Sequence, residues 1–124
     1  MKARIWVGFM LAATPLAVAE AMPVSTFITM ADSLKSKGAM AFFSGDLKRL
    51  TQSIKGDAAL LKAENQAAVA AGRPKSFCAP AGGIKMGNDE VMTAMQAVPA
   101  PRRSTTDTKD ALRAYFARRF PCRA

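Results

Sequence analysis

The first 21 residues constrain the fold most, because they have the layout of a secretory signal peptide and leave only the rest of the chain to fold. A short positive region with Lys2 and Arg4 precedes 15 uncharged residues, 5–19, and small residues follow. A membrane-spanning helix needs roughly 20 apolar residues, which is more than this run provides. The sequence therefore predicts a cleaved signal peptide, residues 1–21, and no transmembrane anchor.

Two A-x-A patterns place the cleavage after Ala19 or Ala21, and the second site leaves 103 residues, 22–124, as a single domain. A domain of this size buries a modest core and often needs a covalent staple. Its two cysteines, Cys78 and Cys122, would enter an oxidising compartment, where an even number of cysteines most simply forms a disulfide. We expect a periplasmic or secreted domain closed by one disulfide.

Charge narrows the classes of partner. After cleavage, sixteen basic and eight acidic residues give the chain a net charge of +8. Export argues against nucleic acid, so acidic proteins and anionic membrane surfaces remain as electrostatic partners. A charged surface that serves only solubility explains the same composition equally well.

Apolar residues recur at helical spacing through the mature chain, and no segment alternates with the period of a strand. The spacing predicts helices over 25–37, 46–71 and 88–98, and a last helix that Thr105 or Thr106 caps and Pro121 ends. Residues 75–87, rich in glycine and proline, are expected to form a loop. The fold class is therefore all-α, a small domain of four to five helices.

A short apolar run, 39–43, lies between Gly38 and Ser44. Glycine at the end of a helical pattern is typical of a helix terminus. We expect this run to form one helical turn or a bend that places the rings of Phe42 and Phe43 in the core.

Residues that carry out chemistry are scarce. The chain has no histidine, and so it lacks the commonest general base and metal ligand. Two cysteines are too few for a zinc site, and 80–83 lacks the Gly-Lys-Ser/Thr ending of a phosphate loop. We expect no cofactor, no metal and no enzymatic activity, with an enzyme as the third-ranked hypothesis.

Two regions are the expected contact surfaces for a partner: the glycine-rich loop and the arginine-rich C-terminal quarter. Loops on a rigid scaffold are common binding elements, and arginine pairs bidentately with carboxylates at interfaces. A solvated helix face that complements the helix dipole explains the arginines as well. The candidate contact residues are Pro80, Gly82, Gly83, Lys85, Arg102, Arg103, Arg113 and Arg118.

The C-terminal half has a distinctive layout. It begins with Phe77-Cys78-Ala79-Pro80-Ala81-Gly82, continues into the helix expected over 88–98, and closes with Phe120-Pro121-Cys122. Over residues 77–122 this resembles the Tai/Rap-type immunity proteins, small exported helical proteins with an F-C-x-P-x-G segment, two helices and a terminal F-P-C. Members of that family bind and neutralise peptidoglycan amidases that type VI secretion delivers. The resemblance implies a Cys78–Cys122 disulfide.

The resemblance implies a protein that occludes a peptidoglycan amidase, or another cell-wall hydrolase, by stoichiometric binding. The N-terminal half departs from the family pattern, since it lacks the second cysteine pair, and no toxin-binding residue is carried over. The alternative is a periplasmic stress chaperone or an envelope-surface-associated protein of broad specificity. The sparse apolar seam of the helix over 46–71 also leaves room for a homodimer.

Overall fold

The computed structural model describes residues 21–123, so residues 1–20 of the expected signal peptide lie outside the described residues. Within this range the elements, in chain order, are α1 (Val24–Lys37), the 3-10 helix η1 (Gly38–Phe43), α2 (Gly45–Ala70), α3 (Asn88–Gln96), the 3-10 helix η2 (Ala100–Arg102) and α4 (Thr108–Arg119). The only extended pairing among these residues is an isolated bridge between Pro23 and Asp107. The predicted all-α class is confirmed.

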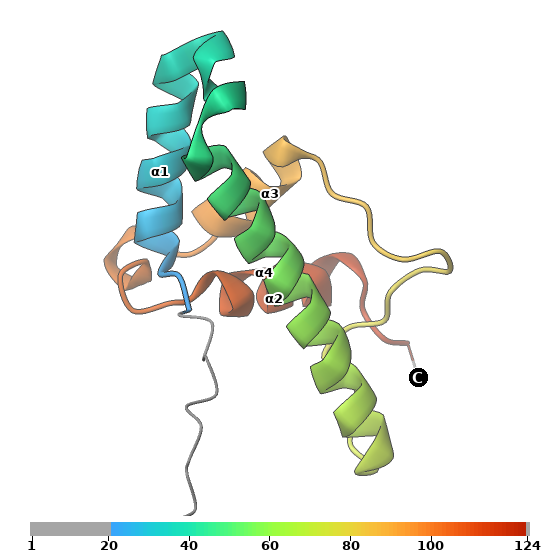
Figure 1. The fold of residues 1–124 in the computed structure, drawn as a ribbon. Helices are drawn as coiled ribbons and strands as arrows, with labels where there is room; N and C mark the ends of the chain where they lie inside the picture. Colours follow the sequence, from blue (N-terminus) through green and yellow to red (C-terminus); the bar gives the residue numbers. More distant parts are fainter. Residues whose placement is uncertain (1–20, 124) are drawn as a thin grey trace, which may run out of the picture.

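Helices α1 and α2 form a hairpin with η1 at its tip (Figure 1). Helix α4 packs against α1, α2 and α3, and α1 also packs against α2 and α3. In Figure 1 the tip of the hairpin points away from α4, and the second half of α2 extends past the other helices. Helix α4 is therefore the centre of the fold, and two parts of the hairpin project from it.

The core lies where α4 meets the other three helices. Met95 of α3 and Leu112 of α4 are fully buried, and each such side chain contributes about 1.5–3 kcal/mol through burial. The buried apolar residues of the described chain are Val24, Phe27, Leu34, Leu50, Leu61, Phe77, Ala94, Met95, Ala111, Leu112 and Phe116.

The start of α1 is tied to the segment that precedes α4. The Val24 N–H donates to the Thr106 carbonyl at 2.8 Å, and the Thr108 N–H donates to the Met22 carbonyl at 2.9 Å. The Ser25 N–H also donates to the Arg103 carbonyl, at 3.0 Å. These bonds fix the foot of the hairpin to the C-terminal half of the chain.

The same bonds explain why α4 begins later than the sequence predicted. Thr105 and Thr106 do not cap it, because they lie in the turn that pairs with Val24, and the Thr106 hydroxyl donates to the Arg102 carbonyl at 2.7 Å. Asp107 is the N-cap residue. The other predicted helices differ from the observed ones by two residues or fewer at each end.

The loop between α2 and α3 is attached near its middle by a disulfide. Cys78 and Cys122 are joined, with their Cα atoms 4.9 Å apart, which confirms the expected pairing. The Cys78 N–H also donates to the Phe120 carbonyl at 2.8 Å. The middle of the loop is thereby held against the segment that follows α4.

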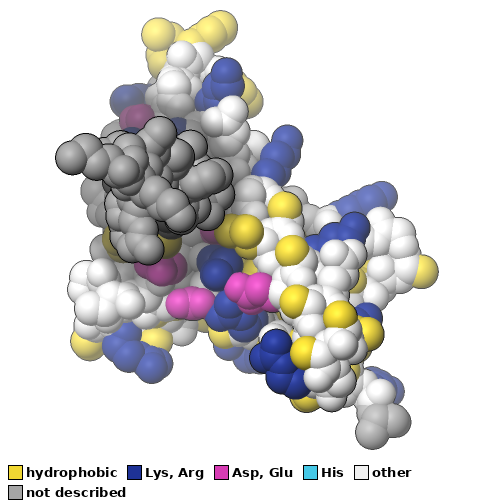
Figure 2. All heavy atoms as spheres, turned by 60° about the horizontal axis from the view of Figure 1, so that its bottom comes forward, with side chains coloured by type: hydrophobic (Ala, Val, Ile, Leu, Met, Phe, Trp, Pro, Cys, Tyr) yellow, Lys and Arg dark blue, Asp and Glu magenta, His cyan; other side chains and the backbone are white. Residues whose placement is uncertain are grey.

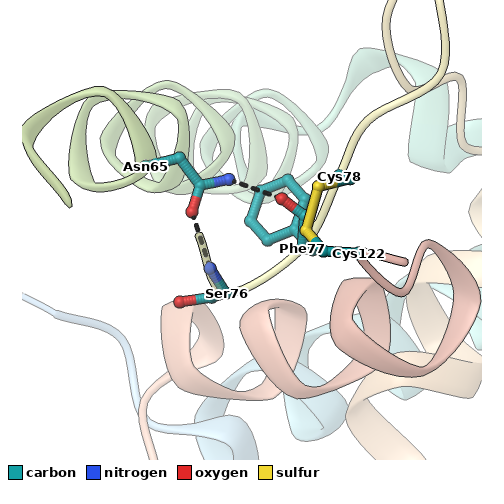
Figure 3. Close-up of a disulfide and its surroundings, with 5 residues drawn as sticks. All are labelled: Asn65, Ser76, Phe77, Cys78 and Cys122. Atoms are coloured by element: carbon teal, nitrogen blue, oxygen red, sulfur yellow. Dashed lines mark hydrogen bonds between the residues drawn. A yellow bond between two sulfur atoms is a disulfide. The ribbon is translucent and has the colours of Figure 1, made fainter. Parts of the chain in front are cut away.

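A buried amide provides a second attachment (Figure 3). The side chain of Asn65 on α2 donates from Nδ2 to the Phe77 carbonyl and accepts from the Ser76 N–H, both at 3.0 Å. The Phe77 ring is buried, with its centroid 5.1 Å from that of Phe116 on α4. Because an unpaired buried polar group is costly, the two bonds of Asn65 favour one position of the loop on α2.

Candidate functional site

The tip of the hairpin exposes three large apolar side chains, Met40, Phe42 and Phe43, which we call the aromatic tip. Their exposed fractions are 69%, 80% and 88%, and no residue of η1 is buried. The expectation that Phe42 and Phe43 enter the core is therefore wrong. The chain reverses at Gly38, whose φ of 56° favours glycine, and places η1 at the end of the hairpin that points away from α4 (Figure 1).

Next to the tip, an apolar groove of about 410 Å³ lies between α1, α2 and α3. Phe42 lines it too, so that the tip and the groove form one apolar surface. Most of its lining is hydrophobic: Phe27, Ala31 and Leu34 from α1, Leu47, Leu50 and Ile54 from α2, and Met86, Val91 and Met92 from α3 and the residues before it.

Helix lengths explain the groove. At 1.5 Å per residue, α1 is about 21 Å long and α3 only about 13 Å. Both helices of the hairpin carry apolar side chains on their facing sides, and the shorter α3 covers only part of them. The apolar surface that α3 leaves uncovered forms the groove.

Positive charge borders the groove. Its polar lining consists of Lys35, Thr51, Lys55 and Asn88, and both lysines are exposed. The stretch 24–56 carries five basic residues and two acidic ones. Few polar groups inside and cations at the edge suit a ligand that is apolar in its middle and anionic at its flanks.

The loop residues predicted from the sequence are exposed. Gly82 and Gly83 have φ values of 89° and 87°, a region that favours glycine, and the Gly83 N–H donates to the Pro80 carbonyl at 3.1 Å. Lys85 is exposed and immediately precedes Met86, which lines the groove. The loop surface predicted from the sequence therefore adjoins the groove at Lys85.

Two of the predicted arginines are engaged within the molecule. Arg103 donates from Nε to the Val98 carbonyl at 2.8 Å and from Nη2 to the Gln96 carbonyl at 3.0 Å, near the end of α3. Arg113 forms ion pairs with Glu64 and Asp110.

The other two predicted arginines, Arg102 and Arg118, line a second hollow of about 210 Å³. This hollow lies between the C-terminal end of α3 and α4, and Asp110 also lines it. The structure thus brings together Arg102 and Arg118, and separates both from the groove, whose lining includes neither.

A polar network joins α2 to α4. Glu64 accepts from Lys109 at 2.8 Å and from Arg113 at 2.7 Å, and Asp57 accepts from the Thr108 hydroxyl. Figure 2 shows acidic and basic side chains gathered in the middle of this face. Hydrogen bonds from Lys109 and Arg113 lower the pKa of Glu64, whereas burial raises the pKa of Asp57. Glu64 and Asp57 therefore serve to hold α2 against α4.

The two pKa shifts predict opposite effects of pH on stability. The lowered pKa of Glu64 contributes stability that is present above its unfolded pKa of about 4.5 and is lost as the pH falls through its folded pKa. The raised pKa of Asp57 contributes stability that is lost as the pH rises through its folded pKa. We expect Asp57→Asn, which keeps an acceptor for Thr108, to gain stability relative to the wild type as the pH rises from 3 to 7.

Urea unfolding across this pH range measures the effect, with Glu64→Gln as the matched variant. Glu64→Gln is expected to lose stability relative to the wild type as the pH rises over the same range, because it lacks the charge that Lys109 and Arg113 stabilise. Parallel pH profiles for the wild type and both variants would contradict the assignment.

The groove was missed by the sequence reasoning, which assigned contacts by residue chemistry and loop character. A signal was present in the apolar faces of the two hairpin helices, which exceed what the nine residues of α3 cover. Among residues 21–123 no three potential metal ligands gather, and no helix there has the length and apolar character to cross a membrane.

Comparison with models of known protein families found no match, and neither did comparison with curated proteins or with solved structures. The groove and the aromatic tip are therefore assigned from the geometry and chemistry of this chain.

Proposed function

We propose that this chain is an exported protein-binding domain that acts by stoichiometric contact, without catalysis. The observation that carries the proposal is the continuous apolar surface of the aromatic tip and the groove. Contiguous exposed apolar patches on a small domain mark interaction sites. Aromatic residues and methionine are also enriched in the cores of protein interfaces.

The scaffold beneath this surface supports the proposal. The foot of the hairpin is bonded to the segment before α4, and the loop that ends at Met86 is held by the disulfide and by Asn65. A surface that is already ordered before binding loses less conformational entropy when it binds. The domain is therefore suited to hold one partner tightly.

The resemblance of residues 77–122 to the Tai/Rap-type immunity proteins supplies the class of partner: a peptidoglycan amidase or another cell-wall hydrolase, bound outside the cytoplasm. Export rests on the signal-like layout of residues 1–21. In this proposal the segment 77–122 provides α3 as one wall of the groove, and the hairpin provides the other two walls and the tip. Binding there would occlude the hydrolase.

The exposure of Met40 and both phenylalanines also favours a second function, a periplasmic chaperone of broad specificity. Flexible thioethers and exposed rings adapt to many apolar clients. The two functions differ in how many proteins bind and in what ratio.

The test is an affinity capture from an envelope extract with the oxidised domain, 22–124, quantified by mass spectrometry. The variant Phe42→Ser/Phe43→Ser removes two exposed anchors, and interface anchors of this kind contribute about 2 kcal/mol or more each. We expect one dominant partner at about 1:1 with the wild type, and at least about 100-fold weaker binding to the variant in a titration. The matched control is Leu60→Ser/Val69→Ser, which removes two exposed apolar residues outside the groove.

All three proteins should unfold at similar urea concentrations, since exposed substitutions change stability by about 0.5 kcal/mol or less. Equal loss of partner by the tip variant and the control would contradict the groove and tip as the site. A broad spread of clients would establish the chaperone in place of the specific binder.

A further inference from the structure

We infer that the element bound in the groove is an amphipathic α-helix of the partner protein, with acidic residues flanking its apolar face. The inference rests on the proposed function and specifies the structure and charge of what that site recognises. Three observations carry it: the hydrogen-bonding state of the groove walls, the shape of the apolar surface, and the charges at its edge.

The walls offer almost no backbone groups to a ligand. The groove is lined mainly by side chains of α1, α2 and α3, whose backbone groups, beyond the first and last turns, bond within their own helices, and the described chain has no strand whose edge could accept an extended peptide. Thr51, one of the four polar residues of the lining, already donates to the Leu47 carbonyl at 2.9 Å. An extended peptide would bury unpaired backbone groups there, whereas a helix satisfies its own.

The shape of the surface favours a helix over a bilayer. A groove of about 410 Å³ is in the size range of sites that enclose a ligand, and helices dock in such grooves through side chains at i, i+3 or i+4, and i+7. A flat membrane surface could contact the protruding tip, but it would leave the groove between the three helices unfilled. Phe42, which lines the groove and is 80% exposed, connects the two regions for a convex partner.

The positive charges at the edge of the groove indicate which residues flank the apolar face of the bound helix. Lys35 of α1 and Lys55 of α2 both line the groove, and the stretch 24–56 carries three more basic residues against two acidic ones. Acidic residues beside the apolar face of a bound helix are attracted to this edge, and basic ones are repelled. A second copy of this chain would bring the same positive edge against itself, which disfavours self-association through the groove.

The experiment uses a displayed library of random 18-residue peptides, selected on the immobilised oxidised domain, 22–124, at physiological salt. We expect the enriched peptides to carry apolar residues at i, i+3 or i+4, and i+7 with Asp or Glu beside them. Synthetic copies should gain helical circular dichroism on binding. Lys35→Glu/Lys55→Glu should weaken binding at least tenfold, and exchange of the peptide's acids for lysine should restore it.

The control for charge is Lys62→Glu/Lys75→Glu, which changes the net charge equally at exposed positions outside the groove. Equal weakening by both charge variants would overturn the inference, as would enriched peptides without helical spacing or with basic flanks. Tighter binding to phosphatidylglycerol vesicles than to any selected peptide would also overturn it, in favour of a membrane surface.

The outcomes separate the inference from the proposed function. If the envelope extract yields a tip-dependent partner and the library yields no helical peptides, the inference fails and the proposed function stands. If no tip-dependent partner is captured, both fail. If the partner is captured and its binding segment is an acid-flanked helix that Lys35→Glu/Lys55→Glu no longer holds, both are supported.

Discussion

Replacing Cys78 and Cys122 with serine will lower the free energy of unfolding by roughly 4 kcal/mol. The two residues are 44 positions apart, and a crosslink across a loop of this length restricts the unfolded chain by about that amount in the chain-entropy model. Domains of this size have a total stability of about 5–15 kcal/mol, so the variant should lose between about a quarter and about four fifths of it. Urea unfolding of the oxidised wild type and of the double serine variant measures the difference.

Reduction provides the control for this result. A thiol reductant should destabilise the wild type by a similar amount and leave the serine variant unchanged, because all the cysteine of the chain is in this one bond. A loss below about 1 kcal/mol would contradict the chain-entropy account. It would mean that the bonds of Asn65 and the packing of Phe77 already restrict the loop without the crosslink.

Phe116→Ala will have an effect of similar size, about 3–5 kcal/mol, which is usual for removal of a buried phenylalanine ring. Phe116 is 3% exposed. Its ring centroid lies 5.1 Å from that of Phe77 and 6.3 Å from that of Phe120. Truncation would therefore open a cavity between α4 and both chain segments that the disulfide joins.

The matched control is the same substitution at an exposed ring. Phe43→Ala, at a side chain that is 88% exposed, should change the free energy of unfolding by about 0.5 kcal/mol or less. Urea unfolding of both variants distinguishes a core ring from a surface ring. Similar losses in the two variants would contradict the placement of Phe43 at the tip.

The helices themselves were predictable from the sequence. Local chemistry marks the end of α1 and both ends of α2: Gly38 ends α1, the Ser44 hydroxyl accepts from the Asp46 N–H at 3.2 Å at the start of α2, and Gly72 follows the end of α2. Signals of this kind involve residues a few positions apart, and so they are visible in a single sequence.

The positions of individual side chains were not predictable in the same way. The apolarity of Phe42 and Phe43 led to the prediction that both rings enter the core. The prediction failed because a sequence does not show whether another helix reaches them. From the sequence alone, Asn65 is typical of a solvated helix face. In the structure it is buried because the chain folds back and Ser76 and Phe77 form hydrogen bonds with its side chain. Arg113 was assigned to a partner surface, and its ion pair with Glu64 joins residues 49 positions apart. Each of these outcomes depends on contacts between distant parts of the chain.

The aromatic tip has no part in the packing of the core, since η1 contributes no buried residue. Selection for folding therefore places little restriction on the side chains at 40, 42 and 43, whereas it restricts the buried residues of α4 closely. If the proposed function holds, substitutions at the tip alter which protein is bound while the scaffold persists. In the proposed function a lineage carrying this domain would follow a changing target through the tip, and its descendants would resemble one another most in the buried residues of α4.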